Sequence, residues 1–326
     1  MLDEALEGPL VTDDLRIYGA THDGTVVALD RRTGLRAWQV GERPGVLSFG
    51  AGTLVVREPH GAVWGIDPAS GAPRWKSDSE VAGTLPATVS GDRVLVAGEG
   101  LVALDVLTGR KVWAVADAPN ASAAPVVSGP WILVGEADGT LRCRDAATGK
   151  SLWTVATGGR VIAAPIVDDR QRIFIGTTGR RILALGFEKG HTHWRWRTGA
   201  DVQVPAAVFG DKVLVASHED VLYAFKRESG DLVWRAALPS RPLAGPLVLG
   251  KSVLVACHEN EVVGFDGRSG ARLGALRAPA EIRTPPLLIE GLLYVGLRDR
   301  SVVALKLGGA GASPLPVAEP VRRPNP

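Results

Sequence analysis

Short apolar segments separated by turn residues run along the whole chain. In GTVVALDRRTGLRAW (24–38), an alternating apolar segment ends at Asp30, a polar turn contains Gly34, and a second segment reaches Trp38. Alternation with a period of two is typical of β-strands, whereas an amphipathic helix repeats its apolar positions about every 3.6 residues. No part of the chain sustains the helical period. The pattern therefore predicts an all-β protein built from short strands and tight turns.

The same unit recurs along the chain. It returns as GAVWGIDPASGAPRW (61–75), LVALDVLTGRKVW (101–113), GTLRCRDAATGKSLW (139–153), RILALGFEKGHTHW (181–194) and VLYAFKRESGDLVW (221–234), and in two less regular copies, EVVGFDGRSGARLG (261–274) and SVVALKLGGAG (301–311). The turn glycines stand 37 to 41 residues apart: Gly34, Gly71, Gly109, Gly149, Gly190, Gly230 and Gly270. A second unit lies between the copies, as in AAPVVSGPWILVGEADG (123–139) and AAPIVDDRQRIFIGTTG (163–179).

Each repeat therefore contains four strands, which we name A to D. Four strands in about 40 residues form one blade of a β-propeller. The sequence predicts an eight-bladed β-propeller of four-stranded repeats, with residues 1–311 as one propeller domain and residues 312–326 as a C-terminal closing segment and Pro-rich tail.

Two residue types recur once per blade, and both are expected to be structural. Aspartates end strand C, where a short carboxylate accepts backbone N–H groups of the following turn: Asp30, Asp67, Asp105, Asp145 and Asp266. Tryptophans in strand D are expected to wedge between neighbouring blades and donate their N–H to a carbonyl: Trp38, Trp75, Trp113, Trp153, Trp194 and Trp234.

The last two blades depart from this pattern. Gly274 and Pro314 stand where the other blades have tryptophan, so we expect weaker packing and local opening near blades 7 and 8. The residues before Pro9 are too few to supply a full strand D, so the N-terminus is not expected to close the ring. Strand D of blade 8 should be short or absent, with residues 312–318 as its best candidate.

Composition narrows the classes of function. The chain has 37 basic and 35 acidic residues, so its net charge of +2 does not indicate binding to nucleic acid. No apolar segment reaches the ~18 residues of a transmembrane helix, and the N-terminus MLDEALEG lacks the features of a secretory signal. Two locations stay open: the cytoplasm, or the periplasm and outer membrane with the export signal missing from this sequence.

The motifs A-x-P-V-V, V-x-V-G and G-x-L-x-A-L-D-x-x-T-G-x-x-x-W resemble the repeat of the pyrroloquinoline-quinone (PQQ) type propellers over residues 8–310. Members of this size resemble the BamB-type propellers, lipoproteins of the outer-membrane β-barrel assembly machinery. Others resemble the sensor propellers of receptor kinases, and longer members are quinoprotein dehydrogenases. The chain has no lipidation cysteine near its N-terminus, unlike an anchored lipoprotein.

Three kinds of chemistry are disfavoured. The resemblance implies that a quinoprotein dehydrogenase has an adjacent Cys-Cys pair, a bound Ca²⁺ and an Asp base, but Cys143 and Cys257 are far apart in sequence and are expected to fill the core. Histidines in equivalent hairpins, His22, His218 and His258, should be about 10 Å apart, too far to share a metal ion bound at about 2 Å. No nucleophile or phosphate-binding motif occurs. We therefore predict no enzyme activity, no cofactor and no metal site.

A propeller offers a rigid surface for a protein partner. The first expectation is a monomeric, BamB-like scaffold in outer-membrane protein assembly or another envelope complex, and the alternative is a ligand-sensing propeller of a signalling system. Residues 160–197 carry eight basic and three acidic side chains, whereas the rest of the chain is slightly acidic. Arginine is enriched at protein interfaces, so we predict a docking edge for an acidic partner made by Arg170, Arg172, Arg180, Arg181, Arg195 and Arg197.

Overall fold

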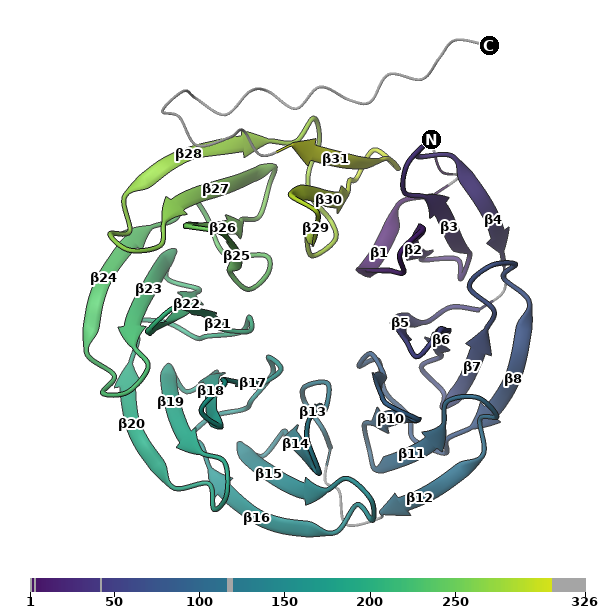
Figure 1. The fold of residues 1–326 in the computed structure, drawn as a ribbon, viewed down its shortest axis with the longest axis horizontal. Helices are drawn as coiled ribbons and strands as arrows, with labels where there is room; N and C mark the ends of the chain where they lie inside the picture. The colour runs from purple at the N-terminus through teal and green to yellow at the C-terminus, as the bar shows by residue number, and fades with distance from the viewer. Residues whose placement is uncertain (1, 3, 42, 116–119, 307–326) are drawn as a thin grey trace.

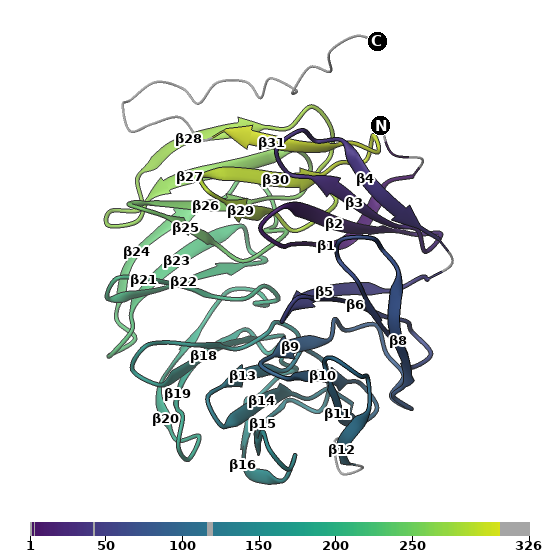
Figure 2. The ribbon, with the colours of Figure 1, turned by 45° about the vertical axis from the view of Figure 1, so that its right-hand side comes forward.

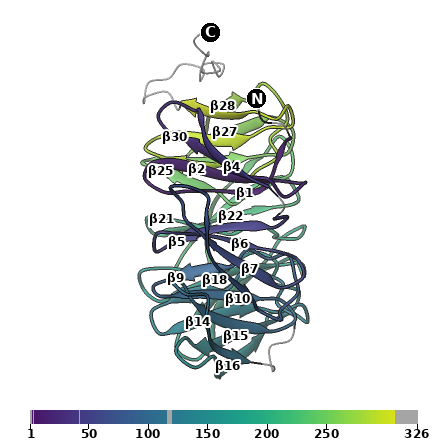
Figure 3. The same cartoon turned by 90° about the vertical axis from the view of Figure 1, so that its right-hand side faces the viewer.

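The computed structural model describes residues 2, 4–41, 43–115 and 120–306. These residues form 31 β-strands in eight antiparallel sheets. Figure 1 shows the sheets arranged as blades around a central axis, and Figure 3 shows the resulting disc from its edge. The prediction of an eight-bladed all-β propeller is confirmed.

Blades 1 and 2 contain β1 (Leu6–Thr12), β2 (Arg16–Thr21), β3 (Val26–Asp30) and β4 (Arg36–Val40), and β5 (Val46–Gly50), β6 (Thr53–Arg57), β7 (Ala62–Ile66) and β8 (Pro73–Asp78). Blades 3 and 4 contain β9 (Thr88–Ser90), β10 (Arg93–Ala97), β11 (Leu101–Asp105) and β12 (Lys111–Val115), and β13 (Val126–Ser128), β14 (Trp131–Gly135), β15 (Thr140–Asp145) and β16 (Ser151–Ala156).

Blades 5 and 6 contain β17 (Ile166–Val167), β18 (Arg172–Thr177), β19 (Arg181–Gly186) and β20 (Thr192–Arg197), and β21 (Ala207–Phe209), β22 (Lys212–Ser217), β23 (Val221–Lys226) and β24 (Leu232–Ala237). Blades 7 and 8 contain β25 (Leu247–Leu249), β26 (Ser252–Ala256), β27 (Glu261–Asp266) and β28 (Arg272–Arg277), and β29 (Leu287–Ile289), β30 (Leu292–Gly296) and β31 (Val302–Lys306).

Every blade is an antiparallel meander whose strands follow chain order from the axis outward (Figures 1 and 2). Because strand direction alternates, the A–B and C–D turns lie on one face of the disc, which we call the CD face. The B–C hairpins and the D–A linkers lie on the opposite face, which we call the BC face. Two residues of one blade can therefore lie at opposite ends of the molecule.

The turn after strand C has the predicted chemistry. In blade 4, Asp145 Oδ1 accepts the Thr148 N–H at 2.8 Å and the Thr148 O–H at 2.7 Å. These hydrogen bonds lower the pKa of Asp145, and the Thr148 hydroxyl has the largest effect. Gly149 has a φ of +72°, in the left-handed region that glycine occupies at least cost, and the ladder is bulged just before the turn.

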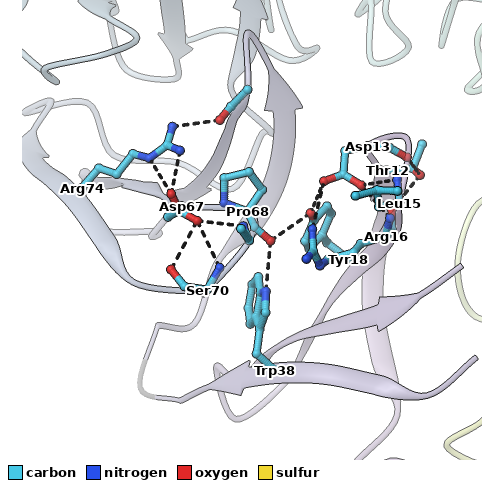
Figure 4. A network of polar contacts seen from close by, with 12 residues as sticks. Thr12, Asp13, Leu15, Arg16, Tyr18, Trp38, Asp67, Pro68, Ser70 and Arg74 are labelled. Atoms are coloured by element: carbon cyan, nitrogen blue, oxygen red, sulfur yellow. Dashed lines mark hydrogen bonds and ion pairs between the residues drawn. The ribbon is translucent and has the colours of Figure 1, made fainter.

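The strand D tryptophans join the blades as predicted. Each indole N–H donates to a backbone carbonyl of the next blade at 2.9–3.3 Å. Figure 4 shows the first of these bonds, from Trp38 to the carbonyl of Pro68, which also accepts the Tyr18 O–H. Each ring also covers the turn glycine of the next blade, as Trp38 covers Gly71.

The apolar core lies between adjacent blades. In one cluster, Leu133 and Leu141 of blade 4 pack with Leu183 and Leu185 of blade 5. Similar clusters fill the other interfaces, so every sheet buries both of its faces against neighbours. Burial of apolar area at each interface is the main force that keeps the ring together.

Blade 8 has three strands in the described part of the chain, with β31 at its outer edge. The predicted closing segment, residues 312–318, lies outside the described residues, as does the boundary at residue 311. As expected, the described N-terminal residues form no strand in blade 8, yet they do contact it. The Leu2 N–H donates to the Arg300 carbonyl at 3.0 Å, and Leu2 and Leu6 pack in one cluster with Tyr294.

Candidate partner-docking surface

The six arginines predicted to form one docking edge lie on three parts of blade 5. Arg170 lies in the A–B turn and Arg172 begins β18, so both are on the CD face. Arg180 lies in the B–C hairpin, while Arg181 begins β19 and Arg197 ends β20, so these three are on the BC face. Arg195 lies between the faces, on the outer strand. The structure thus corrects the grouping into a single edge.

Arg172 belongs to a buried network between blades 5 and 6. Its Nη1 donates to the Arg227 carbonyl at 3.0 Å, and its Nε lies 3.6 Å from the Asp168 carboxylate. Arg227 donates to the same carboxylate at 3.1 Å and to Asp169 at 2.5 Å. The Arg172 side chain is only 10% exposed. It therefore joins two blades, and we remove it from the docking surface.

Arg170 is exposed but lies close to an acidic neighbour. Its guanidinium is 3.9 Å from the Glu228 carboxylate. The shallow pocket beside it, of about 130 Å³, is lined by Arg170, Arg172, Lys226, Arg227, Asp211 and Glu228. Because carboxylates lie among these cations and in the network beneath them, the CD face of blade 5 carries little unbalanced positive charge.

The BC face of blade 5 differs in this respect. Arg181 stands directly opposite Arg197 in the β19–β20 ladder, and Arg195 projects from the same side of the sheet two residues earlier. Like charges placed directly opposite each other destabilise a sheet. In the part of the chain that the structure describes, Arg180, Arg181, Arg195 and Arg197 form no ion pair, and all four are exposed. We call these four residues, three on the BC face and Arg195 beside them on β20, the BC arginine cluster.

Arg160 lies next to this cluster, although the sequence analysis used it only in the charge count. Its carbonyl accepts the Thr178 N–H at 3.0 Å, and its own N–H donates to the Thr178 hydroxyl at 3.0 Å. These bonds fix the linker between strand D of blade 4 and strand A of blade 5 against the B–C hairpin that contains Arg180. Because linkers and B–C hairpins recur at a regular spacing and lie on the same face, the sequence could have predicted that Arg160 lies near the hairpin of blade 5.

Trp196 supports the cluster from behind. It projects from the side of β20 opposite Arg195 and Arg197, and its ring centroid lies 5.3 Å from that of Phe225 in blade 6. The residue is 36% exposed. It therefore fixes strand β20 against the next blade and leaves an aromatic edge open to solvent near the arginines.

Arg57 is a buried cation that the sequence analysis missed. It is 1% exposed, and its guanidinium donates to the carbonyls of Leu85, Ala97 and Val81 at 2.6–3.2 Å. Burial lowers its pKa to about 10. In the seven other blades the same register position is small: Ala20, Ala97, Gly135, Gly176, Ala216, Ala256 and Gly296. An arginine at a repeat position that is otherwise Ala or Gly could have been noticed in the sequence. Its role is to hold the linker between blades 2 and 3.

Chemistry-bearing residues are otherwise scattered. Cys143 and Cys257 are both buried free thiols, and burial raises the pKa of each to about 11. Within the described ranges, no group of three or more His, Cys, Asp or Glu side chains is placed to hold a metal ion. The same residues include no helix long and apolar enough to cross a membrane.

Comparison with known proteins assigns the family. The family model described as outer membrane protein assembly factor BamB matches residues 22–129, 98–204 and 195–322, which together cover most of the chain. The chain belongs to the BamB family. No curated protein sequence matches it significantly.

Solved structures agree with this family's fold. BamB from Moraxella catarrhalis is 21% identical with a TM-score of 0.79, and the match covers 92% of this chain and 96% of that BamB. The computationally designed Ika8 protein is 16% identical with a TM-score of 0.80, over 92% of this chain and 96% of Ika8. Quinohemoprotein alcohol dehydrogenase from Comamonas testosteroni is 13% identical with a TM-score of 0.74, over 90% of this chain and 70% of the enzyme. At these identities, the similarities show the fold alone.

Proposed function

We propose that this BamB-family propeller is a non-catalytic scaffold that docks an acidic segment of a protein partner on the BC arginine cluster. The observation that carries the proposal is the cross-strand pair Arg181–Arg197, which brings two like charges together without an acidic partner in the described part of the chain. A fold gains nothing from such a pair, whereas an incoming carboxylate would neutralise it and form bidentate hydrogen bonds.

The family supports the proposed setting. Its model is described as an outer membrane protein assembly factor, so the proposed partner is a component of outer-membrane protein assembly or another envelope complex. The proposed location is accordingly the periplasm or the inner side of the outer membrane, and the proposed scaffold is a monomeric propeller.

An enzymatic role receives less support. The similarity to the quinohemoprotein extends over 70% of that enzyme, so part of the enzyme has no counterpart here. The two cysteines of this chain are buried in different blades, and they do not form the adjacent pair that the resemblance implies for the quinoprotein site. Among the described residues, we find no feature that specifically favours the alternative function, a ligand-sensing propeller.

The experiment replaces Arg181 and Arg197 together with glutamate and measures binding to the assembly machinery purified from the native organism. We expect weaker binding, with the largest loss at low ionic strength, because screening by salt reduces the electrostatic steering that the cluster supplies. The matched control is Arg170→Glu, an exposed arginine of the same blade on the opposite face. Unchanged binding by the folded double variant, or equal loss in the control, would contradict the proposal.

A further inference from the structure

The linkers that precede blades 5 and 6 have the same construction. The linker before blade 5 has the sequence TGGR (157–160), and the linker before blade 6 has TGAD (198–201). In each, a buried threonine hydroxyl donates to the carbonyl two residues later, at 2.7 Å from Thr157 and at 2.6 Å from Thr198. Each linker lies on the BC face, where it is hydrogen-bonded to the B–C hairpin of the blade that follows it. The two sites can therefore be compared position by position.

Equivalent positions of these two sites have opposite charges. The last linker residue is Arg160 before blade 5 and Asp201 before blade 6, and its carbonyl accepts a hairpin N–H at 3.0 and 2.9 Å, respectively. In the hairpins, Arg180 has a φ of +56° and Asp220 has a φ of +62°. The hairpins of blades 1, 2 and 4 have glycine at this left-handed position: Gly24, Gly61 and Gly139. A residue with a side chain costs more free energy there than glycine does, so the fold alone does not favour these two charges.

A linker glycine supports one charged side chain in each blade. A Cβ built on Gly158 would collide with the guanidinium of Arg181, and a Cβ built on Gly199 would collide with the carboxylate of Glu219. Each charged group therefore lies against its linker, in space that a larger residue would fill. Glu219 Oε1 also accepts the N–H of Gly199 at 2.9 Å and the O–H of Tyr223 at 2.6 Å. Both charged groups are thus held in place on the BC face.

Neither site is neutralised by its own blade. We call Asp201, Glu219 and Asp220 the blade 6 acids. In the part of the chain that the structure describes, the blade 6 acids form no ion pair, and neither does the BC arginine cluster. In blade 8, by contrast, Glu281 of the linker lies 3.2 Å from Arg298 of the hairpin. The fold can therefore pair opposite charges at these places, but blades 5 and 6 place charges of one sign together.

The groups around the blade 6 acids leave this site negative. Burial, and then the nearby Arg241, lower the pKa of His218, so its imidazole is uncharged at neutral pH. Arg241 ends the next linker and Arg235 stands opposite Tyr223 in the ladder, and neither forms an ion pair among the described residues. Three carboxylates beside two arginines keep a net negative charge at blade 6, next to the positive charge at blade 5.

We infer that the partner segment presents two opposite charges: an acidic side chain that binds Arg181 and, about three or four residues away, a basic side chain that binds Glu219. Sheets that pack face to face lie about 10 Å apart, and an extended chain covers this distance in about three residues. Two adjacent sites of opposite charge also fix the direction in which the segment binds. This inference rests on the proposed function, because it specifies the chemistry of the segment that docks at the BC arginine cluster.

Selection from a library of short random peptides tests this charge pattern. The peptides are displayed on phage and selected on the full chain, and the enriched sequences are compared with the unselected library. We expect enrichment of one acidic and one basic residue about three or four positions apart, in a single order along the peptide.

Two variants of the chain test the contribution of Glu219. Glu219→Gln keeps an oxygen that can accept the hydrogen bonds from Gly199 and Tyr223 but removes the negative charge. We expect the basic position to lose its enrichment, and a peptide selected on the unchanged chain to bind this variant about tenfold more weakly in fluorescence anisotropy. The matched control, Glu228→Gln, removes an exposed glutamate of the same blade on the CD face and should leave enrichment and affinity unchanged.

The sign of the change in Glu219→Gln distinguishes this inference from a purely acidic partner. A carboxylate near the arginines repels an acidic ligand, so its removal would strengthen the binding of a segment without a basic residue. Equal or tighter binding by Glu219→Gln, enrichment of acidic residues alone, or an equal loss in the control would overturn the inference. Acidic enrichment that disappears when Arg181 and Arg197 are changed to glutamate would still support the arginine cluster. No enrichment of charged residues would contradict both proposals.

Discussion

At the scale of single residues, the turn aspartates connect the repeat to the stability of the fold. Asp67 accepts the N–H groups of Ala69 and Ser70 and lies 2.7 Å from Arg74 (Figure 4). Arg74 lowers the pKa of Asp67 to about 2, and the equivalent carboxyls Asp30, Asp105, Asp145 and Asp266 are also shifted downward.

This shift predicts acid sensitivity. A depressed pKa in the folded state stabilises the protein above the unfolded value of about 4, and that stabilisation is lost as the pH falls toward 2. We expect the free energy of unfolding in urea to decrease steadily over this range. In Arg74→Ala the decrease should be smaller, because the pKa of Asp67 returns toward its ordinary value. An identical pH dependence in the variant would contradict this account.

Arg57 allows a second test at this scale. Removing its guanidinium leaves the carbonyls of Leu85 and Ala97 without their donor in a buried site. Arg57→Ala should therefore lower the free energy of unfolding by about 2–4 kcal/mol, measured by urea denaturation. Arg93→Ala, at a half-buried arginine paired with its neighbour Asp92, is the control and should change stability little.

The sequence could not predict the role of a residue whose partners lie far away along the chain. Arg172 is of a residue type that is common in docking surfaces. In the fold, however, it is buried and donates a hydrogen bond to the carbonyl of Arg227, which is 55 positions away in the sequence. The exposed arginines could have been sorted better, because strand direction alternates and alone separates Arg170 from Arg181. The sequence could not show that, among the described residues, no acidic side chain pairs with Arg181 or Arg197.

At the scale of elements, strand D and the turn of the next blade act as one unit. The tryptophan, the turn glycine and the aspartate recur in fixed positions, so their joint role was predictable from the repeat. The interfaces around blade 8 were less predictable, because no motif indicates that the Leu2 N–H donates a hydrogen bond to the Arg300 carbonyl.

Removing one wedge tests this unit. Trp153 donates to the Phe187 carbonyl at 3.0 Å and covers Gly190, but it is only partly buried. Trp153→Ala should lower the free energy of unfolding by about 3 kcal/mol, the lower end of the range for aromatic truncation, while partner binding by the folded variant is retained. Trp196→Ala should lower the free energy of unfolding by less, since in the part of the chain that the structure describes Trp196 has no hydrogen bond to the next blade, and it is more exposed. Loss of partner binding without loss of stability would make Trp153 a contact residue.

At the scale of the whole molecule, the interfaces between neighbouring blades, which we call seams, are not all alike. Six seams contain a tryptophan wedge, whereas blade 7 has Gly274 at this position and relies on apolar contacts such as Leu276 with Leu293. We expect native-state hydrogen exchange to be fastest in β28 to β31 and slowest in the strands of blades 2 to 6. Uniform protection around the ring would contradict a weak region at blades 7 and 8.

We propose that the BC face of blade 5 contacts the partner in the cell. The most direct measurement places a photo-crosslinking amino acid at Arg197, on the BC face, or at Arg170, on the CD face, and crosslinks living cells of the native organism. We predict that position 197 captures a component of outer-membrane protein assembly and that position 170 does not. Capture from position 170 alone, or from neither position in cells that contain the folded protein, would contradict the account.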